Sequence, residues 1–102
     1  MISVKPLFIE GQPFTATQVK LPKTNLLIVS NEVGYVMCGA LDVDLLNDKL
    51  GERKIVAARA TGVKTIEQLL DAPLDKVTTE AKNYGWYEGI NAKDALLAIS
   101  KV

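Results

Sequence analysis

The 102-residue sequence contains no histidine and a single cysteine, Cys38. The lack of imidazole excludes histidine-ligated zinc sites and every mechanism that uses a histidine base. One cysteine cannot form an internal disulfide. Twelve basic and twelve acidic side chains cancel to a net charge of zero, so no overall field attracts nucleic acid or an acidic membrane. These absences predict a protein that binds no metal, cofactor, nucleic acid or membrane.

Long hydrophobic runs are also missing. No stretch approaches the roughly eighteen apolar residues of a membrane-spanning helix, and the first residues, MISVKPLFIEG, do not have the pattern of a secretory leader. We therefore expect a cytoplasmic protein. Apolar residues make up 48% of the chain and charged residues 24%, an ordinary globular composition. The length suits one domain over residues 1–102, and no repeat or linker divides it.

Strand patterns fill residues 1–40. The segments are ISVKPLFI, FTATQVKL, NLLIVS and GYVMCGA. Pro6 interrupts the first and suggests an edge strand, because proline cannot donate a backbone hydrogen bond. Turns are expected at residues 11–13 and 31–34, where glycine stands beside polar residues or proline. This region is predicted to form a β-meander of hairpins.

Helix and strand signals alternate over residues 41–102. A short helix is expected after Asp42, followed by a buried strand in KIVAARA and by a helix opened by a capping box of Thr65 and Gln68. Further apolar stripes predict helices over residues 74–84 and after Asn91. The predicted fold class is therefore α/β in the broad sense (α+β), in one small domain.

The strands at residues 25–30 and 35–40 are apolar on both faces. Such strands need cover on both sides, and the predicted helices are short and few. The second face, or the free edge of the first two strands, is therefore expected to be covered by another copy of the chain. This predicts a homo-oligomer, with residues 1–40 as its association region.

The whole chain resembles the YunC-like proteins, a bacterial and archaeal family of unknown function. The resemblance rests on FIEGQPFTATQVKLPKTNLL, GYVMCGALDVDLLNDKL and GVKTIEQLLDAPLDKVT, which follow in the same order and spacing. It implies a small α/β domain whose N-terminal β region mediates tetramerisation, so a tetramer is favoured over a dimer. It implies no activity, cofactor or catalytic residue.

Cys38 is the one candidate nucleophile. It precedes Gly39 and the expected helix start at Asp42, and a helix N-terminus favours the thiolate. However, Cys38 shares its strand face with Val36, which favours burial, and no histidine can act as its base. The pattern therefore indicates a buried, unreactive thiol more than a catalytic one.

Arg59 is unusual because it stands inside the apolar segment IVAARA. Its guanidinium must reach solvent, pair with a carboxylate such as Asp42, or face an anion. The following turn holds Gly62, Lys64 and Thr65, whose backbone amides could bind phosphate or carboxylate, although the turn lacks a P-loop motif.

Two functions follow from these patterns. The first is a homo-oligomeric binding or structural module. The alternative is a small enzyme that uses Cys38 beside an anion pocket of Arg59, Lys64 and helix amides. The sequence leaves open whether the protein is an enzyme. A buried thiol would favour the module, and an accessible thiol in a concave pocket would favour the enzyme.

Overall fold

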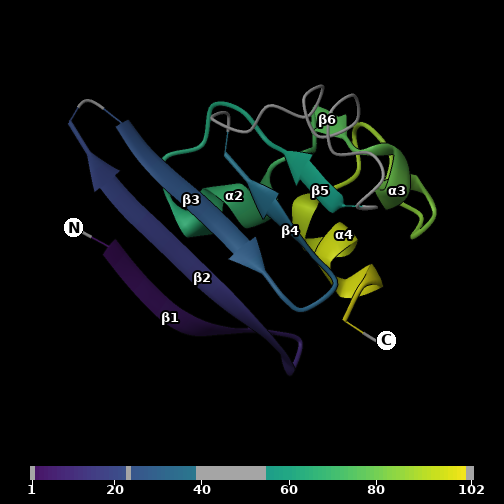
Figure 1. The fold of residues 1–102 in the computed structure, drawn as a ribbon, viewed down its shortest axis with the longest axis horizontal. Helices are drawn as coiled ribbons and strands as arrows, with labels where there is room; N and C mark the ends of the chain where they lie inside the picture. Colours follow the sequence, from purple (N-terminus) through teal and green to yellow (C-terminus); the bar gives the residue numbers. More distant parts are fainter. Residues whose placement is uncertain (1, 23, 39–54, 101–102) are drawn as a thin grey trace.

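The computed structural model describes residues 2–22, 24–38 and 55–100. Within these ranges the chain forms one mixed sheet in the order β1-β2-β3-β4-β5-β6 (Figure 1). The strands are β1 (Ile2–Ile9), β2 (Gln12–Leu21), β3 (Thr24–Ser30), β4 (Gly34–Met37), β5 (Val56–Arg59) and β6 (Lys76–Val77). The helices are α2 (Ile66–Asp71), α3 (Thr79–Lys82) and α4 (Ala92–Ala98). The predicted α+β fold class is confirmed.

The first four strands form the expected antiparallel meander. β5 then pairs parallel with β4, and β6 pairs antiparallel with β5. The β1–β2 turn is one residue earlier than predicted: it consists of Glu10 (φ 49°) and Gly11 (φ 83°), and Gln12 already pairs with Ile9. Two consecutive positive φ angles are typical of a two-residue type I′ hairpin, whose twist matches that of the strands.

One face of the sheet carries the core. Leu27, Val29 and Val36 are fully buried there, because alternate residues of each strand point to the same side. α2 crosses behind β3 in Figure 1, and α2 and α4 pack against this side. α2 contributes Leu69 and α4 contributes Leu96, and Ile99 directly follows α4; all three are completely buried. We call this the helix face.

The opposite face over β1–β4 is the open face. The strand register assigns it Ile2, Val4, Pro6 and Phe8 of β1, Pro13, Thr15, Thr17 and Val19 of β2, Leu26, Ile28 and Ser30 of β3, and Tyr35 and Met37 of β4. Ile2, Val4 and Phe8 are 62% to 69% exposed. The expectation that the described helices cover only one face of these strands is therefore met.

Side chains fix the starts of the three described helices. Thr65, Thr78 and Asn91 each accept a hydrogen bond from a first-turn N–H of α2, α3 and α4. At α2 the predicted cap is confirmed at Thr65, because Gln68 N donates to Thr65 Oγ1. The second bond of the predicted capping box is displaced by one residue, because the Gln68 side chain accepts from Lys64 N.

The predicted helix over residues 74–84 is wrong. Lys76–Val77 forms β6, and only Thr79–Lys82 is helical. The reason is Thr78, whose buried hydroxyl accepts from Ala57 N and donates to Ile55 O, so that the chain is held against β5. The helix expected after Asp42 lies outside the described residues.

Trp86 anchors the C-terminal part of the core. It is 1% exposed, and its indole N–H donates to Ala95 O of α4 at 2.7 Å. The largest side chain of the core therefore has its one polar atom satisfied, as a buried tryptophan requires.

Candidate functional site

Cys38 is buried directly after β4, on the helix face beside Val36 as the alternation predicts. Only 6% of the residue is exposed. Its Sγ accepts a weak hydrogen bond from Leu27 N at 3.4 Å and lies 3.6 Å from Asn25 O, to which it can donate. These contacts are those of a small core residue whose thiol has backbone partners.

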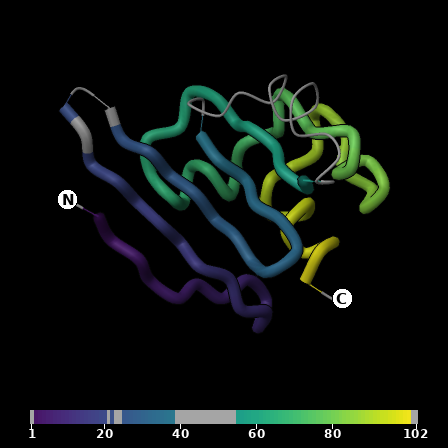
Figure 2. Tube along the Cα trace, viewed as in Figure 1, coloured from purple at the N-terminus to yellow at the C-terminus, as the bar shows by residue number. Residues whose placement is uncertain are grey.

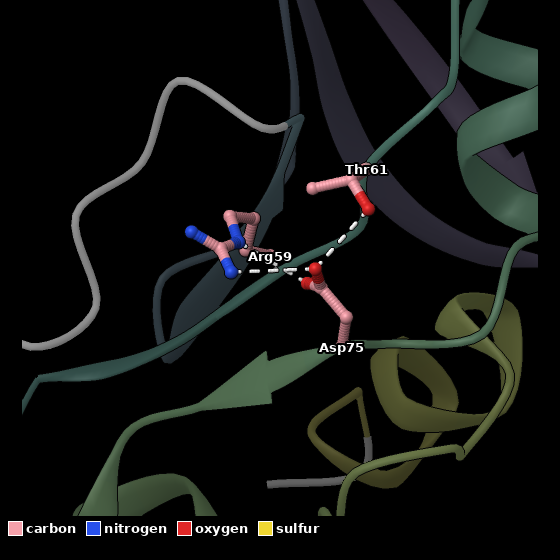
Figure 3. Close-up of polar contacts among 3 residues, drawn as sticks. All are labelled: Arg59, Thr61 and Asp75. Carbon is pink, nitrogen blue, oxygen red and sulfur yellow. Dashed lines mark hydrogen bonds and ion pairs between the residues drawn. The ribbon is translucent and has the colours of Figure 1, made fainter.

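Arg59 is held by an acidic side chain, but its partner is Asp75. The Nε and Nη2 atoms of Arg59 donate to the two carboxylate oxygens of Asp75 at 3.2 and 3.3 Å, and Thr61 adds a hydrogen bond at 3.1 Å (Figure 3). The two charged side chains are 25% and 38% exposed. This bidentate pair fastens the end of β5 to the segment that enters β6.

The turn after β5 uses two of its backbone amides in the cap of α2. Lys64 N donates to Gln68, and Gln68 N donates to Thr65, so the side chains of the capping box use both. Gly62 provides the positive φ (79°) that the turn needs. Asp42 lies outside the described residues. Arg59, Gly62 and Thr65 thus have structural roles in an ion pair, a turn and a helix cap, and the anion site stays a prediction.

The described residues contain neither a metal-binding cluster nor a membrane-spanning helix. No group of three or more aspartate, glutamate, cysteine or histidine residues lies close enough there to hold a metal ion. None of the described helices has the length and apolarity to cross a membrane.

Two adjoining clefts run along the helix face of β1, between that strand and α2. One, of about 340 Å³, is lined by Ser3, Lys5, Pro6, Leu7, Ala16, Gln18, Thr65, Ile66 and Glu67. The other, of about 260 Å³, is lined by Phe8, Ile9, Glu10, Glu67, Leu70, Asp71 and Lys93. Glu67 belongs to both, which places its side chain beside the middle of β1.

The charged side chains of these clefts are not paired with one another. Among the described residues, Lys5, Lys93, Glu67 and Asp71 form no ion pair. The strand pattern of β1 did not indicate the clefts, because they depend on where α2 packs. Their apolar floor includes Leu7 and Ile66, which are partly buried against the core. The clefts thus combine apolar contact area with free charges of both signs.

The open face differs from the clefts in having no charge. Every residue at the open-face positions given above is apolar or neutral. Burial raises the pKa of the Tyr35 phenol on this face, because removal from water disfavours the charged phenolate. Three of the five large apolar residues that are exposed in the described chain are Ile2, Val4 and Phe8. The open face is therefore the main apolar surface of the described chain.

Comparison with known proteins yields relatives without an assigned activity. The chain is 59% identical over 101 residues to the uncharacterised protein YunC of Bacillus subtilis (strain 168), covering 99% of this chain and 100% of the relative. Its fold is similar to the crystal structure of a protein of unknown function, TA1206 from Thermoplasma acidophilum. That match has a TM-score of 0.84 at 28% identity and covers 94% of this chain and 90% of the other.

Residues 37–99 match the model of a domain of unknown function, DUF1805. The matched segment begins at the end of β4 and includes Cys38, Arg59 and the α2 turn, while β1, β2 and β3 precede it. The match covers well over half of the sequence. Together with the near full-length identity to YunC, it establishes that this chain belongs to the DUF1805 family of YunC-like proteins.

Proposed function

We propose that this protein is a cytoplasmic homo-oligomeric module, a tetramer or a dimer, that associates through the open face of its N-terminal strands. The observation that carries the proposal is the exposure of Ile2, Val4 and Phe8 on a face without charged residues. Covering such a surface releases water from apolar area, which favours association by about 25 cal/mol per Å² buried.

The lack of charge supports a second copy as the partner. When a surface packs on its own copy, any charge near the symmetry axis meets a like charge. Stacking of two open faces brings together no such charges over β1–β4. Arg59 of β5 and Lys76 of β6 stand opposite each other in the strand register, at the β5–β6 end of the same side of the sheet. These cations are expected to lie outside the contact.

The contacts of Cys38 support a module over an enzyme. Its thiol is buried, and the Arg59 guanidinium that was a candidate for the anion pocket is bonded to Asp75. A free buried cysteine also suits a reducing compartment, where disulfides are rare. The described geometry gives no specific support to the alternative of a cysteine-dependent enzyme.

Light scattering after size-exclusion chromatography at micromolar concentration tests the proposal. The wild-type protein should elute with a mass of two or four chains. Val19→Lys places a charge in the open face and should reduce that mass. Tyr84→Lys is the matched control, because Tyr84 is exposed away from the sheet faces on the segment after α3. A monomeric wild type, or an unchanged mass in Val19→Lys, would contradict the proposal.

A further inference from the structure

We propose that the free edge of β1, together with the two clefts beside it, binds an extended peptide segment of a different protein. The segment pairs antiparallel with β1 and adds a strand to the sheet. Figure 2 shows β1 along the outer margin of the sheet. Within the described chain, β2 is its one neighbouring strand. This contact goes beyond the proposed self-association, because it uses the edge of the sheet and takes an unrelated partner.

The hairpin geometry determines which backbone groups β1 directs outward. In a two-residue hairpin the closing pair, here Ile9 and Gln12, exchanges hydrogen bonds, and bonded pairs then alternate along the two strands. Val4, Pro6 and Phe8 occupy the other positions, so their backbone groups point away from β2. No hydrogen bond joins these groups to another described residue. The edge therefore offers N–H and C=O groups that an added strand can satisfy.

Pro6 favours a partner other than a second β1. It has no N–H, so the edge lacks one donor between Val4 and Phe8. A pair of two β1 strands contains a proline on each side and loses both donors, whereas a segment without proline loses only one. Such a segment exchanges both hydrogen bonds with Val4 and with Phe8, and it donates one more to the carbonyl of Pro6. The residues opposite positions 4 to 8 are enough for all of these bonds.

The clefts determine the charges of the segment. Its side chains opposite Lys5 and Leu7 point to the helix face, where both residues line the first cleft. Glu67 lines both clefts, so a basic side chain opposite Leu7 lies beside its carboxylate. An acidic side chain opposite Lys5 meets the ammonium group. Neither Lys5 nor Glu67 has an ion-pair partner among the described residues of its own chain. The segment therefore carries a basic residue and, two positions later, an acidic one.

The second cleft favours arginine as the basic residue. Its lining includes the carboxylates of Glu10, Glu67 and Asp71, while Lys93 is the single cation among its described lining residues. The guanidinium group of arginine can donate to more than one carboxylate because its donors form a planar fork. Its long apolar stem can at the same time cover Leu70, which also lines this cleft.

The open-face side of the edge selects apolar residues. Val4 and Phe8 are 62% and 66% exposed there, and each lies beside the residue of the segment that stands opposite it. Apolar side chains at these two places remove apolar area of both partners from water. The segment that fits the edge is therefore apolar, arginine, any residue except proline, acidic and apolar, in that order.

A labelled peptide tests the charges. Fluorescein-labelled Thr-Val-Arg-Thr-Glu-Val-Thr should bind the wild-type protein saturably in fluorescence polarisation. The peptide with glutamate in place of arginine should bind about tenfold more weakly. Glu67→Lys should reverse this preference, because the cleft then attracts the glutamate. Glu88→Lys, at an exposed position outside the clefts, is the matched control and should keep the wild-type preference. No saturable binding up to about 1 mM, or an unchanged preference in Glu67→Lys, would overturn the proposal.

N-methylation of the peptide tests the strand pairing. A methyl group on the backbone nitrogen of the first valine removes the donor to the carbonyl of Phe8 and keeps the side chain. This change should weaken binding about tenfold or more, since the methyl group also obstructs the edge. The same group on the arginine nitrogen, which points away from β1, is the matched control and should have little effect. Equal losses for the two peptides would contradict antiparallel pairing in this register.

Cross-linking tests the register independently of charge. In a Cys38→Ala background, Lys5→Cys should form a mixed disulfide with the peptide that carries cysteine in place of glutamate. The two Cα atoms would be about 4.5 Å apart, within the range of disulfides. The peptide with cysteine in place of arginine is displaced by two residues and should cross-link much more slowly. Equal rates for the two peptides would overturn the proposed register.

Saturating peptide distinguishes this contact from association between copies. Sedimentation velocity should give the wild-type mass with only the peptide added, because the edge is free in the assembly. A fall in mass would show that a second copy holds the edge, and it would overturn the proposal. If instead the proposed self-association is wrong, the wild type is monomeric and still binds the peptide.

Discussion

The side-chain amide of Asn31 donates a hydrogen bond to the backbone carbonyl of Ile99 at 3.1 Å, across 68 positions of sequence. Its Oδ1 accepts from the N–H groups of Val33 and Gly34 at 2.8 and 3.1 Å. A single side chain thus closes the β3–β4 turn and ties it to the end of α4.

Asn31→Ala should lower the free energy of unfolding by about 2 to 3 kcal/mol, because it removes three hydrogen bonds at a partly buried position. Asn31→Asp keeps the acceptor and loses the donor to Ile99, so its loss should be smaller. Urea unfolding measures both. Asn83→Ala is the control, since Asn83 makes an exposed hydrogen bond to Glu80. Equal losses in Asn31→Ala and Asn83→Ala would contradict the tethering role.

Gly34→Ala should destabilise the parallel β4–β5 pairing. A Cβ at this position would overlap the carbonyl oxygen of Val56 and lie 2.8 Å from its Cβ. Relief of this overlap requires the two strands to separate, which we expect to cost about 3 kcal/mol or more. Gly62→Ala is the control: its Cβ meets no atom, and a left-handed backbone costs only about 1 kcal/mol. A loss at Gly34 no larger than at Gly62 would be inconsistent with the close approach.

Cys38 should react slowly with a thiol reagent at neutral pH in the native protein and rapidly in urea, because its sulfur is buried. Cys38→Ala should fold with a loss of about 1 to 2 kcal/mol, as for other small buried groups. The reaction rates are measured from the absorbance of the coloured product that the reagent releases when it reacts with Cys38. Fast stoichiometric labelling of the native protein would revive the enzyme hypothesis.

Arg59→Met should cost less than about 1 kcal/mol. A buried ion pair at this position would have implied a loss of about 3 kcal/mol or more in the free energy of unfolding. Both partners of the Arg59–Asp75 pair are partly exposed, and exposed ion pairs contribute little to stability. Addition of phosphate should change the midpoint of thermal unfolding by the same amount in the wild type and in Arg59→Met. Phosphate protection that is specific to the wild type would instead identify Arg59 as an anion anchor.

The stability of the protein should fall as the pH rises above about 10. Burial raises the folded-state pKa of Tyr35 above its ordinary value of 10.0, so the native state keeps a proton that the unfolded chain loses. The stabilisation is therefore complete below pH 10 and is lost as the pH rises through that value toward the folded pKa. Tyr35→Phe should flatten this part of the stability profile, measured by urea unfolding.

Local signals predicted the parts of the fold that depend on a few neighbouring residues. The alternation in β4 correctly placed Cys38 beside Val36, and the Thr65–Gln68 spacing correctly predicted Thr65 as the cap of α2. The same kind of local pattern gave a wrong prediction for residues 74–84. Their helical stripe competes with hydrogen bonds from Thr78 to residues more than twenty positions away, and that competition has no local signature.

The candidate site was harder to predict for the same reason. Arg59 was recognised as needing a partner, but Asp75 reaches it only because β6 returns beside β5. The clefts of β1 depend on the packing of α2, which the strand sequence does not encode. The apolar character predicted for residues 25–30 and 35–40 did indicate a sheet face that the described helices do not cover, because two-sided hydrophobicity is a local property of a strand.

The position of Trp86 has a practical consequence for measuring this protein. Its indole is enclosed between the segment after α3 and α4, on the helix side of the molecule, and it is the only tryptophan in the chain. Its fluorescence should therefore follow folding of the C-terminal core and stay nearly constant when chains associate through β1–β4. Emission and mass can thus be recorded on one dilution series, so that dissociation of subunits is distinguished from their denaturation.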